Sequence, residues 1–222
     1  MKNQQEIATP KNATFEEPQT KVQQTCETKR SLFMRLFFSG AITHSTTPSK
    51  KVAYIAVTAA FLAVANMFEI KFADVQFSLT IAVSALAGVM LGSIFGCVAA
   101  FLGDLVGFLF NSGGFAYMPW VGINLAVIAL LAGIIVGGIN LRFRGGLIVK
   151  VSILAVLAFF LCTVGINSTA FWLLYGKGVP YMTYVVTRIF IGGQIYNCLV
   201  NYALLYVIIP VIAKLKIIKF NY

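Results

Sequence analysis

Residues 77–110 read FSLTIAVSALAGVMLGSIFGCVAAFLGDLVGFLF, and Asp104 is the only charged residue among them. A helix of about 20 apolar residues crosses the hydrocarbon core of a bilayer, which is roughly 30 Å thick. The stretch is too long for one such helix and has Gly92-Ser93 near its middle. Because glycine interrupts regular structure, we expect two helices joined by a tight turn. Two consecutive apolar helices of this kind predict an all-α membrane protein.

The rest of the chain extends the same pattern. Of its 222 residues 59% are hydrophobic and 11% are charged, against about 25% charged in an average soluble domain. Four further apolar runs cover residues 52–68, 119–140, 147–175 and 181–213. We therefore predict a single bundle of six transmembrane helices over residues 51–222. The last run is long for one span, so its first turns belong either to the helix or to the preceding loop.

Basic residues indicate the orientation of the helices, because cytoplasmic loops collect Lys and Arg. One predicted face holds Lys50, Lys51, Arg142, Arg144, Lys150, Lys214, Lys216 and Lys219, and the other holds Lys71 and Lys177. Both the N and C termini are therefore expected in the cytoplasm. The net charge of +10 then orients the helices and needs no nucleic-acid partner.

The first 50 residues differ from the bundle. They are mostly polar and have little to bury, so we expect residues 1–50 to form a disordered cytoplasmic tail. Residues 30–40 mix apolar side chains with Arg30 and Arg35. This pattern favours an interfacial helix on the cytoplasmic leaflet, with a plain linker as the alternative.

Reactive side chains are sparse. Cysteines at positions 26, 97, 162 and 198 show no metal-ligand spacing and are interpreted as small hydrophobic residues, and His44 is the only histidine. Motifs for a P-loop, a nucleophile elbow, a zinc protease or a dinucleotide site are absent. We therefore expect no enzyme activity, no metal and no cofactor. Any active uptake must draw its energy from a partner or from an ion gradient.

Apart from Lys150, near the cytoplasmic start of the run at 147–175, Asp104 and Arg188 are the only charged residues within the predicted spans. Such groups are costly in a bilayer and usually have a function. Because their charges are opposite, we expect them to pair. The pair is either purely structural or contacts a solute; alternatively, Arg188 extends to the interface.

Amide and aromatic side chains recur at the predicted outward ends of the helices. They form either an aromatic belt at the membrane interface or a pocket for a planar, polar small molecule. The candidate binding residues are Asn111, Tyr117, Trp120, Asn124, Asn167, Trp172, Tyr181, Arg188 and Gln194.

Small residues repeat every four positions in two places. Residues 52–68 contain the pairs Ala56, Ala60 and Ala59, Ala63, and glycines stand at positions 88, 92 and 96. Small residues let helix backbones approach closely. They serve either packing within the bundle or, for the alanines, the docking of a separate membrane subunit.

Several segments in order now point to a family. They are LGDLVGFLF at 102–110, SGGFAYMP at 112–119, NSTAFWLLYG at 167–176 and the arginine-bearing residues 181–188. Together they resemble the substrate-binding S components of energy-coupling factor (ECF) vitamin transporters, most of all the folate type. The resemblance covers residues 50–213. One departure is that the folate-type loop commonly continues Phe-Pro-Gly-Phe-Thr, whereas residues 117–123 read YMPWVGI.

The resemblance implies a vitamin-binding subunit without catalysis, in the plasma membrane of a bacterium. The vitamin, folate-like by this resemblance, would enter a pocket roofed by the loops at 69–76, 111–118 and 176–180. Arg188 would hold an anionic group, aromatic rings would stack on the ligand, and amides would bind its edges. Ala56, Ala59, Ala60 and Ala63 would dock onto a transmembrane coupling subunit driven by two ATPase subunits.

Three alternatives stay open from the sequence. The chain is an S component for another vitamin or small planar solute, or a membrane enzyme or stand-alone carrier that uses Asp104 as a proton-active group, or a structural scaffold. Accumulation of substrate by this chain alone would favour the carrier.

Overall fold

The computed structural model describes residues 47–68, 70–72, 75–112, 116–139, 145–176 and 178–214. All statements on the structure concern these residues. Most of the predicted tail, with its interfacial helix at 30–40, lies outside them, as do Cys26 and His44. Those predictions are therefore untested.

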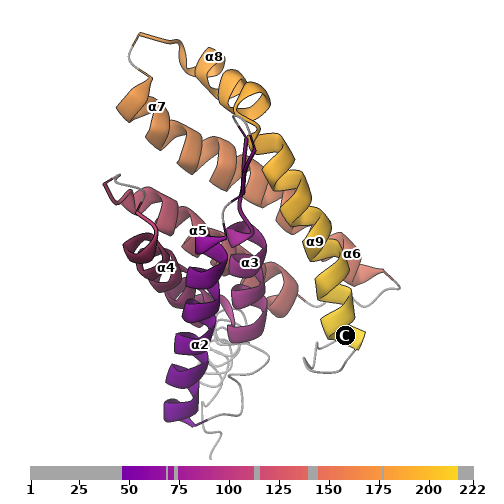
Figure 1. The fold of residues 1–222 in the computed structure, drawn as a ribbon. Coiled ribbons are helices and arrows are strands. Elements are labelled where there is room, and N and C mark those ends of the chain that lie inside the picture. The colour runs from indigo at the N-terminus through magenta and orange to yellow at the C-terminus, as the bar shows by residue number, and fades with distance from the viewer. Residues whose placement is uncertain are drawn as a thin grey trace, which may run out of the picture. The chain divides into compact units, whose positions relative to one another are not determined.

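Helices make up most of the described chain (Figure 1). In order they are α2 (Pro48–Met67), α3 (Thr80–Leu91), α4 (Ser93–Phe110), α5 (Pro119–Ala132), α6 (Gly146–Leu157), α7 (Thr169–Tyr175), α8 (Tyr181–Val186) and α9 (Gln194–Lys214). Three π-helical stretches continue them: η1 (Gly133–Gly138) after α5, η2 (Ala158–Ser168) between α6 and α7, and η3 (Thr187–Ile191) after α8. The expected loop at 69–76 instead contains an antiparallel hairpin of β1 (Ile70–Phe72) and β2 (Val75–Phe77), in which Ile70 faces Phe77.

Five segments are long and apolar enough to cross a membrane: Pro48–Met67, Ser93–Phe110, Pro119–Gly138, Gly146–Tyr175 and Gln194–Ala213. The expected membrane-helical class is thereby supported. The second predicted span is represented by α3, whose 12 residues rise only about 18 Å. The count of six spans and the cytoplasmic termini stay predictions.

The run at 181–213 is not one helix, so that form of the sequence prediction is wrong. It divides at Gly192-Gly193 into the short helix α8 with η3 and the long helix α9. Gly193 has a φ of 68°, a conformation that side chains with a Cβ rarely adopt. Arg188 consequently lies in the short segment that precedes the spanning helix.

The turn between α3 and α4 confirms the split expected at Gly92, whose φ is 88°. The glycine repeat lets backbones meet around this turn. A Cβ on Gly96 would lie 2.6 Å from the Cα of Gly88, and a Cβ on Gly88 would collide with the carbonyl of Ala129 on α5. These glycines therefore pack α3 against both α4 and α5.

The two alanine pairs of α2 have different surroundings. Ala59 and Ala63 are buried, at 8% and 5% exposure. They lie against α4, where a Cβ on Gly103 would come within 2.8 Å of the Ala59 carbonyl. Ala56 and Ala60 are exposed. Of the two pairs, only Ala56 and Ala60 are therefore accessible to a partner.

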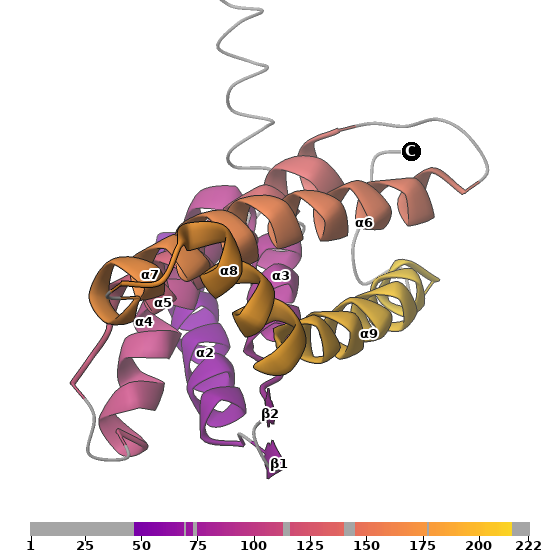
Figure 2. The same cartoon turned by 90° about the horizontal axis from the view of Figure 1, so that it is seen from above.

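Helix α9 contacts α3 and α6, and both views show it beside them (Figure 2). Its fully buried Asn201 holds the start of α3. The amide oxygen accepts from Ala82 N at 2.9 Å, and the amide nitrogen donates to Ser78 O at 2.7 Å and to Asn197 O at 2.8 Å. Asn197 in turn accepts from Ser78 N at 3.1 Å. Two asparagines of α9 thus satisfy backbone groups before and within the first turn of α3.

Replacing Asn201 by leucine is expected to destabilise the protein by about 2–3 kcal/mol, because buried backbone groups lose their partners. The melting midpoint should then fall by roughly 5–10 °C. A thiol-reactive dye that detects exposure of the buried Cys162 and Cys198 would follow the unfolding. Asn111→Ala, which alters an exposed amide, is the control and should shift the midpoint by less than about 1 °C. Equal midpoints for the two variants would contradict this role of Asn201.

Candidate functional site

Two aromatic rings and one cation meet where α5, α7 and η3 approach. Trp120, in the first turn of α5, packs edge-on against Phe171 of α7, with ring centroids 6.0 Å apart. The guanidinium carbon of Arg188 lies 3.8 Å from the centroid of the Phe171 ring. This is the geometry of a cation–π contact. Trp120, Phe171 and Arg188 are called the aromatic–arginine group below.

Two amides follow along the helices that carry this group. Asn124 is one turn beyond Trp120, and Asn167 is one turn before Phe171. The helices run antiparallel because a single short connection, residues 139–145, joins them. Both amides therefore lie on the same side of the contact between Trp120 and Phe171, each about one turn away from it along its own helix.

Three polar atoms of these residues are buried without a hydrogen-bond partner: Trp120 Nε1, Asn124 Oδ1 and Asn167 Oδ1. Buried polar atoms are nearly always paired, so each exception calls for an explanation. One N–H donor and two carbonyl acceptors beside a cation and two rings would suit a flat molecule with polar edges. Four of the nine binding residues predicted from the sequence thus take part: Trp120, Asn124, Asn167 and Arg188.

The local backbone explains how these residues converge. Pro119 begins α5, where a missing N–H costs nothing, and places Trp120 in its first turn. Asn167 and Arg188 both lie in π-helical stretches, η2 and η3. Such wider turns shift side chains around the helix and are frequent at functional sites.

Trp172 and Tyr181 form a second group at the connection between α7 and α8. Their ring centroids are 5.4 Å apart, and Trp172 Nε1 donates to Val179 O at 2.9 Å. The Tyr181 hydroxyl lies 3.0 Å from Thr169 Oγ1. Because both polar atoms have protein partners, this group fixes the course of the chain toward Arg188. A direct binding role for the two rings is untested.

Asp104 does not pair with Arg188, so the expected ion pair is wrong for these two residues. Asp104 is 4% exposed and accepts from Asn66 Nδ2 at 3.4 Å and from the Tyr117 hydroxyl at 3.2 Å. Burial and then the charge and hydrogen bond of Asp104 raise the pKa of Tyr117 to about 12, so the phenol keeps its proton near neutral pH. The physical reason for the difference is that Arg188 lies on the short segment and already has Phe171 as a partner.

The two remaining candidates lie at helix ends. Asn111 is exposed at the C-terminal cap of α4, and Gln194 is half-buried at the first residue of α9. Within the described part of the chain, no side-chain hydrogen bond joins either of them to the aromatic–arginine group. Their predicted role in binding is untested.

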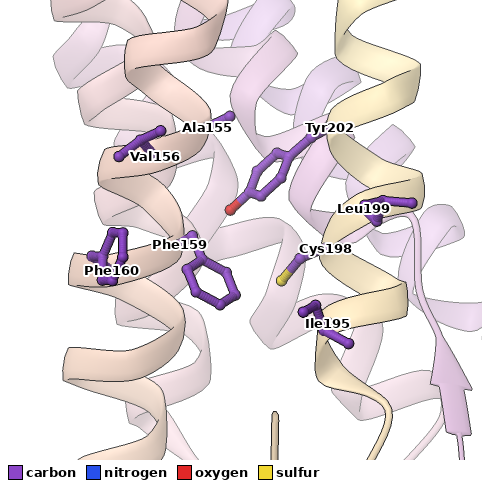
Figure 3. A pocket seen from close by; sticks show the side chains of 8 residues that line it. All are labelled: Ala155, Val156, Phe159, Phe160, Ile195, Cys198, Leu199 and Tyr202. Atoms are coloured by element: carbon purple, nitrogen blue, oxygen red, sulfur yellow. The ribbon is translucent and has the colours of Figure 1, made fainter. Parts of the chain in front are cut away.

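A groove of about 270 Å³ lies elsewhere, between α6–η2 and α9 (Figure 3). Its lining residues are Ala155, Val156, Phe159, Phe160, Ile195, Cys198, Leu199 and Tyr202. The Tyr202 hydroxyl points into it. The nearly continuous hydrocarbon lining suits an apolar occupant, and no residue predicted to bind the ligand takes part.

Sequence reasoning missed Phe171, Asn66 and Asn201. Phe171 stands in an apolar run and therefore carries no signal in composition. Its spacing of four residues from Asn167 would have indicated a shared helix face. Asn66 and Asn201 are polar residues inside predicted spans, and this alone could have marked them as partnered groups.

A sequence model of the family described as ECF-type riboflavin transporter, S component, matches residues 46–216. No curated protein matches the chain. Within the described residues no cluster of His, Cys, Asp or Glu could hold a metal ion. Because the family match spans most of the 222 residues, the chain belongs to the family of S components of ECF-type riboflavin transporters.

Proposed function

We propose that the chain is the vitamin-binding membrane subunit of an ECF transporter and that it binds a flat heteroaromatic vitamin with an anionic group, as folate has. The observation that carries this proposal is the set of three unpartnered buried polar atoms beside the aromatic–arginine group.

Each part of such a ligand has a matching group. The indole N–H of Trp120 can donate to a ring carbonyl or nitrogen, and the amides of Asn124 and Asn167 can bind further ring-edge atoms. The rings of Trp120 and Phe171 offer apolar contact area for a planar ring system. A carboxylate of the ligand would pair with the guanidinium of Arg188, whose planar donors suit that group.

Riboflavin is the second candidate, because the matching family carries its name. Its fused ring system has carbonyl and N–H edges similar to those of a pterin, but it carries no charge. The amides and rings would serve both vitamins, whereas Arg188 distinguishes them. Folate is placed first because a half-buried guanidinium has no carboxylate partner among the described residues.

Transport requires energy that this chain does not supply, since no ATP-binding motif occurs in it. The proposal therefore includes a transmembrane coupling subunit and two ATPase subunits as partners, in the plasma membrane of a bacterium. This chain captures the vitamin and performs no catalytic step.

The binding proposal is tested by titrating purified protein with folate and with riboflavin in parallel. The chain has two tryptophans, Trp120 and Trp172, and only Trp120 belongs to the aromatic–arginine group. In Trp172→Phe, which keeps Trp120, vitamin should change the fluorescence strongly, whereas Trp120→Phe should give a weaker signal. Mass spectrometry of co-purifying small molecules identifies the bound species. Absence of saturable binding of any vitamin would contradict the proposal.

The exposed alanines of α2 give a prediction on coupling. Ala60→Phe should lower vitamin uptake in cells about tenfold, because a bulky ring on this face keeps another helix at a distance. Vitamin binding by the purified chain should stay within about twofold, since Ala60 faces away from the bundle. Phe61→Trp, which enlarges an exposed side chain on another side of α2, is the control and should leave uptake unchanged. Normal uptake by Ala60→Phe would show that this face is not the docking surface.

A further inference from the structure

The side chain of Asp104 connects three parts of the fold. Its carboxyl group, on α4, accepts from Asn66 of α2 and from Tyr117 of the segment 116–118. Helix α5 presses on the same point: a Cβ on Gly122 would lie 2.9 Å from Asp104 Oδ2 and 2.7 Å from the Tyr117 hydroxyl. The Tyr117 ring also packs on Phe108, with centroids 5.1 Å apart. Tyr117 is therefore held in position rather than free to cover a ligand.

This cluster is continuous with the candidate site on one side. Tyr117 stands three residues before Trp120, with Pro119 between them restricting the backbone. Trp120 packs on Phe171, which carries Arg188. A shift of Tyr117 would therefore displace the start of α5 and the unpartnered indole N–H.

On the other side, the cluster is continuous with α2. A Cβ on Gly107 would come within 2.8 Å of the Cβ of Asn66, so α2 and α4 touch at this level. The outward face of the same helix carries the exposed Ala56 and Ala60. Movement of α2 against α4 would thus act on the bond from Asn66 to Asp104.

We propose that Asp104 is a positioning residue that links α2 to the vitamin site through Tyr117 and Trp120, so that a change in α2 alters how fast the vitamin leaves. This inference rests on the proposed function. Coupling between two sites is reciprocal in binding free energy, so a perturbation on the α2 side must change the affinity for the vitamin. Affinity changes among variants of one site fall mostly on the dissociation rate, which is therefore the quantity to measure.

The test measures dissociation of radiolabelled folate and riboflavin from the purified full-length chain. Asn66→Ala should speed dissociation about fivefold, although Asn66 does not belong to the aromatic–arginine group. Asp104→Leu, which keeps the shape of the side chain but accepts no hydrogen bond, should have a similar effect. In the double variant the effect of Asn66→Ala should vanish, because the link is already broken. If Asp104→Leu fails to fold, Tyr117→Phe replaces it in the same cycle.

The control removes a hydrogen bond between two other helices, on the exposed surface of the bundle. Ser152 Oγ and the Tyr206 hydroxyl are 2.6 Å apart and join α6 to α9. Tyr206→Phe should change the dissociation rates by less than about twofold, which separates the link from general loosening of the bundle.

The outcomes distinguish the two proposals. If the unaltered chain binds neither vitamin, the proposed function fails and this inference fails with it. If it binds a vitamin but Asn66→Ala releases it at the normal rate, only the inference is overturned. Additive effects of Asn66→Ala and Asp104→Leu would also overturn it, since independent bonds add.

Discussion

Replacing Arg188 by glutamine should weaken folate binding about a hundredfold and change riboflavin binding less than about threefold. The neutral amide cannot form the charge-assisted pair with a carboxylate, and it also loses the cation–π contact with Phe171. Equilibrium titration of both vitamins on the same preparation gives the ratio directly. This ratio separates the two candidate ligands.

The control for this prediction keeps the charge and alters the shape. Arg188→Lys retains a cation but lacks the flat guanidinium that stacks on Phe171 and grips a carboxylate with two donors. It should recover part of the folate affinity, leaving a loss of about tenfold. Equal losses for folate and riboflavin in Arg188→Gln would show that Arg188 supports the site only through packing.

Replacing Asn124 by leucine should have opposite effects on stability and on binding. Leucine has the same branching and number of side-chain heavy atoms, and the Asn124 Oδ1 it removes is buried and has no hydrogen-bond partner within the protein. The melting midpoint without vitamin should therefore stay level or rise, because an unsatisfied buried group costs about 1–3 kcal/mol. Vitamin affinity should fall about thirtyfold, because the ligand loses a hydrogen-bond partner in a buried site.

The matched control is the same exchange at a satisfied amide. Asn201→Leu should lower the midpoint, since Asn201 binds Ala82, Ser78 and Asn197. Vitamin affinity of the folded Asn201→Leu fraction should change little. A fall in the midpoint of Asn124→Leu as large as that of Asn201→Leu would indicate that Asn124 is structural.

The sequence predicts the helices well where a residue such as Gly92 clearly interrupts an apolar run. Gly92 divides the apolar run at the residue where the structure turns, and the runs at 52–68, 119–140 and 147–175 coincide closely with helical segments. The division at Gly192-Gly193 was recognisable only as excess length. A glycine pair in an apolar run is equally compatible with helix packing, so its positive φ could not be read in advance.

The candidate site was predictable in its residue types but not in its grouping. Trp120, Asn124, Asn167 and Arg188 stand out because polar and amphipathic side chains are conspicuous in apolar helices. Which residues meet between helices does not follow from spacing along one helix, and Arg188 also lies in the π-helical turn η3, which does not keep a period of 3.6 residues. The expected pairing of Asp104 with Arg188 failed for a related reason: complementary charge says nothing about distance.

The glycine pair at 192 and 193 has a consequence for how specificity can vary. On one side of it, Arg188 is attached through Phe171 and the Trp172–Tyr181 group to α7. On the other side, α9 is fastened to α3 by Asn197 and Asn201. Substitutions within residues 171–191 can therefore change the preferred vitamin without affecting the hydrogen bonds that Asn197 and Asn201 of α9 make with the start of α3. Ligand choice and the stability of the bundle are therefore controlled by different segments of the chain, which join at Gly192 and Gly193.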